Sequence, residues 1–159
     1  MKQLESILKK QLLLLEEMLA AAQKQRTALT VNDPRATLEA AQELETLTGR
    51  MNALEKERQE AQKNLEKKWG LTPSRTLAEL AHSLPATEGG NLLLLRGALR
   101  EQAEKLAAFI EVNNLLTKNA LAFSERLLRI VGGGAERVYV ADGKEKEKDR
   151  PAVFFDRSV

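Results

Sequence analysis

The fold is decided by the stretch from Asn91 to Val131, which reads NLLLLRGALREQAEKLAAFIEVNNLLTKNALAFSERLLRIV. At alternating steps of three and four residues it places Leu92, Leu95, Leu99, Gln102, Leu106, Phe109, Asn113, Leu116, Ala120, Phe123, Leu127 and Ile130. Ten of these twelve residues are apolar. This repeat is typical of a long helix that packs lengthwise against another helix. Asn91 offers a cap at its start, and the glycines from Gly132 to Gly134 predict its end.

The apolar face of this expected helix is wider than one neighbouring helix requires. Further apolar residues flank the heptad positions, namely Leu93, Leu94, Ala107, Ala108, Leu115, Leu121, Ala122 and Leu128. A face that broad indicates two partners. The second partner is either another helix of this chain or a helix of another protein. On the latter hypothesis, the expected groove is lined by Ile110, Leu115, Leu121 and Leu128.

Two polar residues in the middle of the stretch have two interpretations. Asn113 occupies a heptad position, where a buried amide usually fixes the register of two helices. The alternative is that Asn113 and Asn114 donate hydrogen bonds to the backbone of a bound peptide.

Two further long helices precede this stretch. Apolar residues keep the same spacing over about 2–30 and again over about 34–69. Between them, Asp33 is a candidate cap and Pro34 fits the first helical position, while Gly70 fits the end of the second helix. Because the connection is so short, the two helices are predicted to form an antiparallel hairpin.

The rest of the chain adds a short helix and a tail. Thr76 and Glu79 have capping-box spacing within an expected helix at about 74–84, and Gly89 and Gly90 predict a loop before the last helix. We therefore expect an all-α fold. It consists of an elongated antiparallel bundle over 1–131, with long helices at about 2–30, 34–69 and 91–131, and an irregular or β-hairpin-like tail over 132–159.

The composition argues against several classes of function. There is no cysteine, and His82 is the only histidine, so no thiolate chemistry or histidine-based metal site is expected. The basic residues exceed the acidic ones by only two, which gives nucleic-acid binding no support. The apolar run from Leu12 to Leu15 is too short for a secretion signal or a membrane span. We expect a cytoplasmic protein without cofactor or enzymatic activity.

Taken in order, the elements resemble the FlgN family of flagellar export chaperones. The residues that carry the resemblance are the Asn-Asp-Pro turn at 32–34, Glu111-Val112-Asn113-Asn114-Leu115-Leu116, and Tyr139-Val140-Ala141-Asp142-Gly143. The resemblance implies a chaperone that binds hook-associated proteins of the hook–filament junction and delivers them to the export gate. It also implies that Tyr139 contacts the cytoplasmic domain of the export-gate membrane protein.

A competing interpretation is a structural coiled-coil or adaptor protein that self-associates, as a homodimer for example, through the same apolar face. The tail leaves alternatives open too. Half of the six aromatic residues lie there, as Tyr139, Phe154 and Phe155. They belong either to a small hairpin folded on the bundle, to a partner-binding segment, or to an incidental tail.

Overall fold

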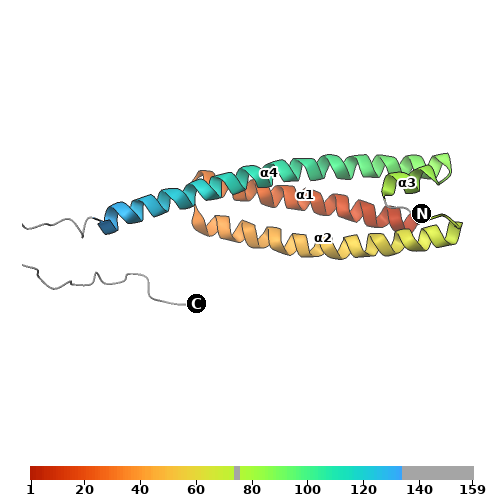
Figure 1. Cartoon of the computed structure of the whole chain (residues 1–159), viewed down its shortest axis with the longest axis horizontal. Coiled ribbons are helices and arrows are strands. Elements are labelled where there is room, and N and C mark those ends of the chain that lie inside the picture. Colours follow the sequence, from red (N-terminus) through yellow and green to blue (C-terminus); the bar gives the residue numbers. More distant parts are fainter. Residues whose placement is uncertain (74–75, 134–159) are drawn as a thin grey trace, which may run out of the picture. The chain divides into compact units, whose positions relative to one another are not determined.

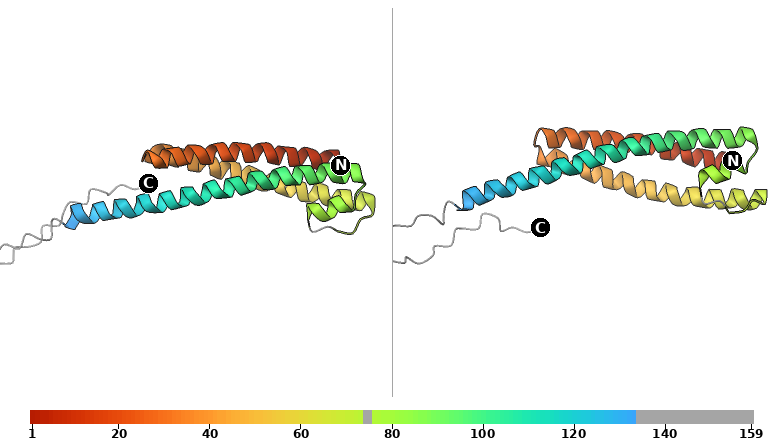
Figure 2. Two further views of the ribbon diagram at one scale, coloured as in Figure 1. Left: turned by 90° about the horizontal axis from the view of Figure 1, so that it is seen from above. Right: turned by 45° about the horizontal axis from the view of Figure 1, so that its top comes forward.

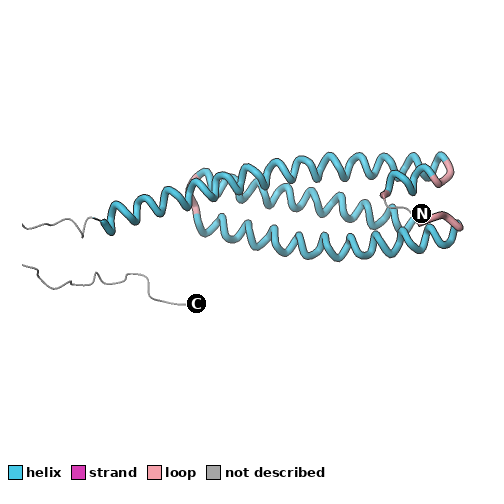
Figure 3. Tube along the Cα trace, viewed as in Figure 1, coloured by secondary structure: helices cyan, strands magenta, loops and turns pink. Residues whose placement is uncertain are grey.

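The structure is a computed structural model that describes residues 1–73 and 76–133. Over these residues it contains helices and no strand (Figures 1 and 3). The helices are α1 (Lys2–Thr30), α2 (Pro34–Trp69), α3 (Leu77–His82) and α4 (Ala86–Gly133). The prediction of an all-α fold is confirmed. The expected irregular or β-hairpin-like tail, with its aromatic residues, lies outside the described residues from position 134 onward.

The chain divides into two compact units, Met1–Lys118 and Asn119–Val159, and α4 contributes to both. Each unit is described by itself. Within Met1–Lys118, α1 and α2 form a closely packed pair of opposite direction, and this part of α4 runs alongside them (Figures 1 and 2).

The turn between α1 and α2 uses the residues expected from the sequence. The Asp33 side chain accepts a hydrogen bond of 3.0 Å from the backbone N–H of Ala36, and Pro34 occupies the first turn of α2. Asn32 has a positive φ of 55°, a conformation that asparagine tolerates better than most residues. At its other end α2 stops at Gly70, which is left-handed with a φ of 63°.

The core of Met1–Lys118 consists of two clusters of buried side chains. The first joins all four helices through Leu4, Ile7, Leu8, Ala61, Leu65, Leu80, Ala81, Leu84 and Leu92. The second joins α1 and α2 through Leu14, Leu15, Met18, Ala21, Ala22, Leu44 and Leu47. Half-buried side chains of α4 cover the second cluster, so this part of α4 packs on the hairpin through its heptad positions.

The expected loop at Gly89 and Gly90 is wrong, because both glycines lie inside α4. The helix begins at Ala86, and Asn91 is therefore not its cap. Gly89 is buried, and a Cβ atom there would lie 2.3 Å from the backbone oxygen of Ala81. The glycine is thus required by the close approach of α3 to α4. The helix α3 itself is shorter than expected, and the Thr76 side chain caps it by accepting from the Glu79 N–H at 3.2 Å.

Candidate protein-docking surfaces

The inner face of α4 within Met1–Lys118 is used for packing. Leu92 is fully buried, and Leu99, Leu106 and Phe109 are half-buried against the core clusters. Ile110, which was expected to line a client groove, is also half-buried against the second cluster. The heptad pattern therefore marks the face of α4 that contacts the hairpin.

Asn113 lies on this inner face and is bound to α1. Its side chain is 2% exposed, and Nδ2 donates to the backbone oxygen of Ala22 at 2.8 Å and to Oε1 of Gln25 at 2.9 Å. Its Oδ1 is buried without a hydrogen-bond partner among the described residues. This geometry favours the register role of Asn113. The neighbouring Asn114 is exposed.

The outer face of α4 carries apolar side chains that nothing in Met1–Lys118 covers. Leu115 is 59% exposed, and Leu94 and Val112 are exposed as well. Leu115 is thus accessible to a helix of another protein, as the hypothesis of a groove for such a helix requires.

The end of α4, described by itself, is strongly amphipathic. Its exposed large apolar residues are Leu121, Phe123, Leu127, Leu128, Ile130 and Val131. At 100° per residue all six fall on one half of the helix, whereas Glu125, Arg126 and Arg129 fall on the other half. We call these six residues the apolar face of α4.

Three members of the apolar face were expected to pack in the seam of the bundle, and the structure shows them exposed. Phe123 is 61%, Leu127 45% and Ile130 72% exposed. Within the unit that begins at Asn119, the described residues form only the end of α4, so no other described helix of that unit can pack against its heptad positions.

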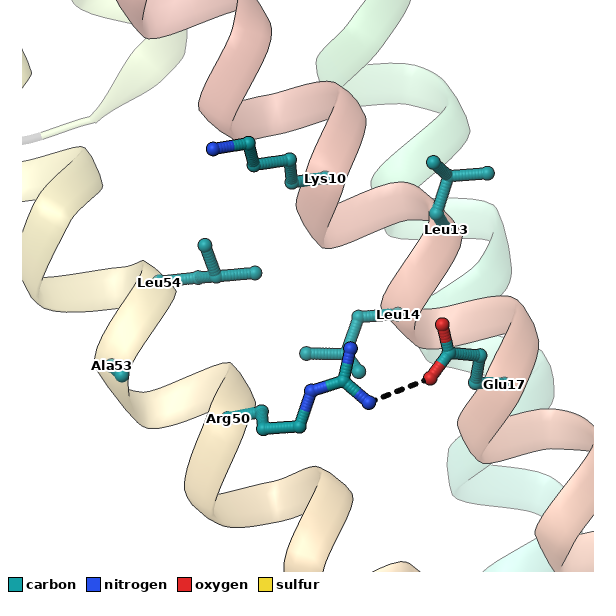
Figure 4. A pocket seen from close by; sticks show the side chains of 7 residues that line it. All are labelled: Lys10, Leu13, Leu14, Glu17, Arg50, Ala53 and Leu54. Carbon is teal, nitrogen blue, oxygen red and sulfur yellow. Dashed lines mark hydrogen bonds and ion pairs between the residues drawn. The ribbon is translucent and has the colours of Figure 1, made fainter.

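Sequence reasoning missed two clefts, whose residues are far apart in the chain. The first is a cleft of about 360 Å³ between α1 and α2 (Figure 4). It is lined by Lys10, Leu13, Leu14, Glu17, Arg50, Ala53 and Leu54. An ion pair of 2.9 Å between Arg50 and Glu17 crosses it, and Lys10 is the third charged residue of its lining.

The second cleft has a volume of about 450 Å³ and is lined by residues of all four helices. They are Gln11, Leu15, Met51, Glu55, Arg58, Leu77, Arg96, Leu99, Arg100 and Ala103. The hydrogen bonds from Arg58 lower the pKa of Glu55 to about 2, against the opposing effect of partial burial, and Gln59 and Gln11 add smaller contributions. Glu55 therefore stays ionised at neutral pH. We call this site the arginine cleft.

A helical bundle that exposes an apolar helix face, as the described residues do, is typical of proteins that bind segments of other proteins. The comparison with protein families agrees with this class, because the model of the FlgN protein family matches residues 1–147. The chain belongs to the FlgN family, a family of flagellar chaperones. No curated protein and no solved structure matches the chain. Among the described helices, none is long and apolar enough to cross a membrane.

Proposed function

We propose that this protein is a cytoplasmic chaperone of flagellar type III export. It binds hook-associated proteins of the hook–filament junction, prevents their premature self-association and delivers them to the export gate. Family membership supports the chaperone role. The observation that carries client binding is the apolar face of α4, whose six side chains are between 45% and 78% exposed.

The physical basis is the burial of an amphipathic client helix against this face. Each leucine that becomes fully buried contributes about 1.5–3 kcal/mol, so a few such residues suffice for a stable complex. Leu121 and Leu128 are the proposed client contacts at the end of α4. Leu115 and Asn114 are proposed contacts within Met1–Lys118, since both are exposed there. Ile110 and Asn113 hold α4 on the hairpin and face the client only if α4 moves.

Contact with the export gate is assigned to Tyr139. This residue lies within the family match at 1–147 and outside the described residues. The assignment follows the family resemblance, and it separates the surface that delivers the client from the surface that holds it.

A second function, self-association, is favoured by the same exposed apolar face, because a second copy of α4 would cover it. Light scattering during gel filtration separates the two functions. With a purified hook-associated protein added, the chaperone function predicts a single peak at the summed mass of client and chaperone. A homodimer that persists beside free client would support the self-association function instead.

A further inference from the structure

The arginine cleft has a feature that the proposed function does not use. Its floor is apolar, formed by Leu15, Met51, Leu77, Leu99 and Ala103. The floor is not sealed, since Met51, Leu77 and Leu99 are only half-buried and Ala103 is exposed. The cleft therefore offers apolar surface to an incoming side chain.

The charges along the cleft are unbalanced. Three arginines line it, Arg58, Arg96 and Arg100, against the single carboxylate of Glu55. Arg58 is paired with Glu55 at 2.6 Å, and its Nη1 also donates to Gln62 at 2.8 Å. Outside the cleft, Glu104 pairs with Arg100 at 2.7 Å.

Arg96 differs from the other two arginines. It is half-buried, and among the described residues it makes no hydrogen bond or ion pair. Partial burial weakens the hydration of a guanidinium without supplying an acceptor in return. A carboxylate brought to Arg96 would restore the lost hydrogen bonds, and it can do so with two parallel bonds to the planar group.

We propose that the arginine cleft docks an amphipathic, acidic helix of a protein partner. The partner's apolar side chains contact the apolar residues of the cleft, and one of its carboxylates pairs with Arg96. A helix fits this site because the cleft is walled by the long helices α1, α2 and α4. Arg58 and Arg100 already have carboxylate partners, so Arg96 is the arginine of the cleft that a carboxylate of the partner helix would pair with.

This inference stands apart from the proposed function. The cleft lies within Met1–Lys118, whereas the apolar face of α4 lies after Asn119. The two proposals can therefore fail separately. Client binding by the apolar face of α4 does not require peptide binding at the arginine cleft, and the reverse also holds.

The absence of cysteine from the chain allows a direct test. In full-length protein, Ala103→Cys carries an environment-sensitive dye in the arginine cleft, and Ala53→Cys carries the same dye in the other cleft as the matched control. The probe is a synthetic amphipathic helical peptide of leucine and glutamate. A peptide with lysine in place of glutamate is its counterpart. The acidic peptide is expected to shift the emission of the dye at position 103 and not at position 53. Its dissociation constant is expected to be at least tenfold lower than that of the basic peptide.

Variants of Arg96 complete the test. Arg96→Gln is expected to weaken binding of the acidic peptide about tenfold. Arg96→Glu is expected to reverse the preference, so that the basic peptide binds more tightly. Arg35→Gln, at an arginine whose side chain is 90% exposed at the start of α2, is expected to change nothing. The helical circular dichroism signal verifies that each variant folds. If Arg96→Glu does not fold, Arg96→Gln alone provides the test. Equal binding of both peptides, no binding up to millimolar concentration, or full binding by Arg96→Gln would overturn the proposal.

Discussion

The side-chain amide of Asn113 on α4 donates a hydrogen bond of 2.8 Å to the backbone oxygen of Ala22 on α1. It is the most buried polar side chain of the described core. Because a buried amide is costly unless it is bonded, this contact is satisfied only when the two helices are in one register. The bond thus fixes which residues of α4 face the hairpin and leaves Leu115 on the outer face.

Replacement of Asn113 by alanine is expected to lower the free energy of unfolding by about 1–3 kcal/mol, because the bonds to Ala22 and Gln25 are lost and a small cavity remains. Urea unfolding followed by circular dichroism measures the change. Asn114→Ala, at the exposed neighbouring residue, is the control and is expected to stay within about 0.5 kcal/mol of the wild type. Equal stabilities of the two variants would show that the amide does not hold α4 in register.

Two adjacent glycines are expected to respond to alanine in opposite directions. Gly90→Ala meets no atom within 4 Å and removes a flexible residue from a helix, so it is expected to stabilise the protein by about 0.5–1 kcal/mol. Gly89→Ala places Cβ 2.3 Å from the Ala81 oxygen and is expected to destabilise it by more than about 1 kcal/mol. Thermal unfolding of both variants measures the difference. A stabilising Gly89→Ala would contradict the described contact between α3 and α4.

At acid pH, the free energy of unfolding is expected to depend on the protonation of Glu55. Its pKa is lowered to about 2, chiefly by hydrogen bonds from Arg58, so the folded state favours the carboxylate. The stabilisation is present above about pH 4.5 and is lost as the pH falls toward 2. Since the side chain is 41% exposed, the effect is about 1 kcal/mol after solvent screening.

The measurement is the melting temperature of Glu55→Gln relative to the wild type between pH 7 and pH 2. The deficit of the variant is expected to shrink across this interval. Glu60→Gln, at an exposed carboxylate five residues further along α2, is the control. A deficit that stays constant with pH would mean that the charge of Glu55 is not involved.

Replacement of Tyr139 by alanine is expected to leave client binding unchanged and to reduce export of the client. The reason is the proposed separation of the gate contact from the client-binding face. Client binding is measured by titration calorimetry with the purified proteins, and export by the amount of client outside the cell. Loss of client binding in Tyr139→Ala would contradict this separation.

Much of the fold could be predicted because its signals are local. Asp33 caps α2 and Gly70 ends it, as their residue types indicate. Gly89 was misinterpreted because the atom that requires a glycine, the oxygen of Ala81, belongs to a different helix. The local sequence pattern predicts that a Gly-Gly pair interrupts a helix. Only the tertiary contact shows that Gly89 allows the close approach of α3 to α4.

The candidate surfaces were predictable only in part. The spacing of Leu121 and Leu128 correctly indicates an apolar face, but the same spacing made Phe123 and Ile130 look like seam residues. A hydrophobic repeat does not tell whether the covering helix belongs to the same chain. The arginine cleft was missed because Leu15, Glu55 and Arg96 come together only through packing of separate helices.

The apolar face of α4 is tested most directly by the dissociation constant of a hook-associated client for the variant Leu121→Ser/Leu128→Ser. Both leucines are more than 60% exposed, so the variant is expected to have the same melting temperature as the wild type. The same is expected of the control Leu38→Ser, at an equally exposed leucine of α2. Client binding by the double variant is expected to be at least about a hundredfold weaker, since each lost leucine contact is worth about tenfold or more. Wild-type affinity in the double variant, with the control also unchanged, would contradict this expectation.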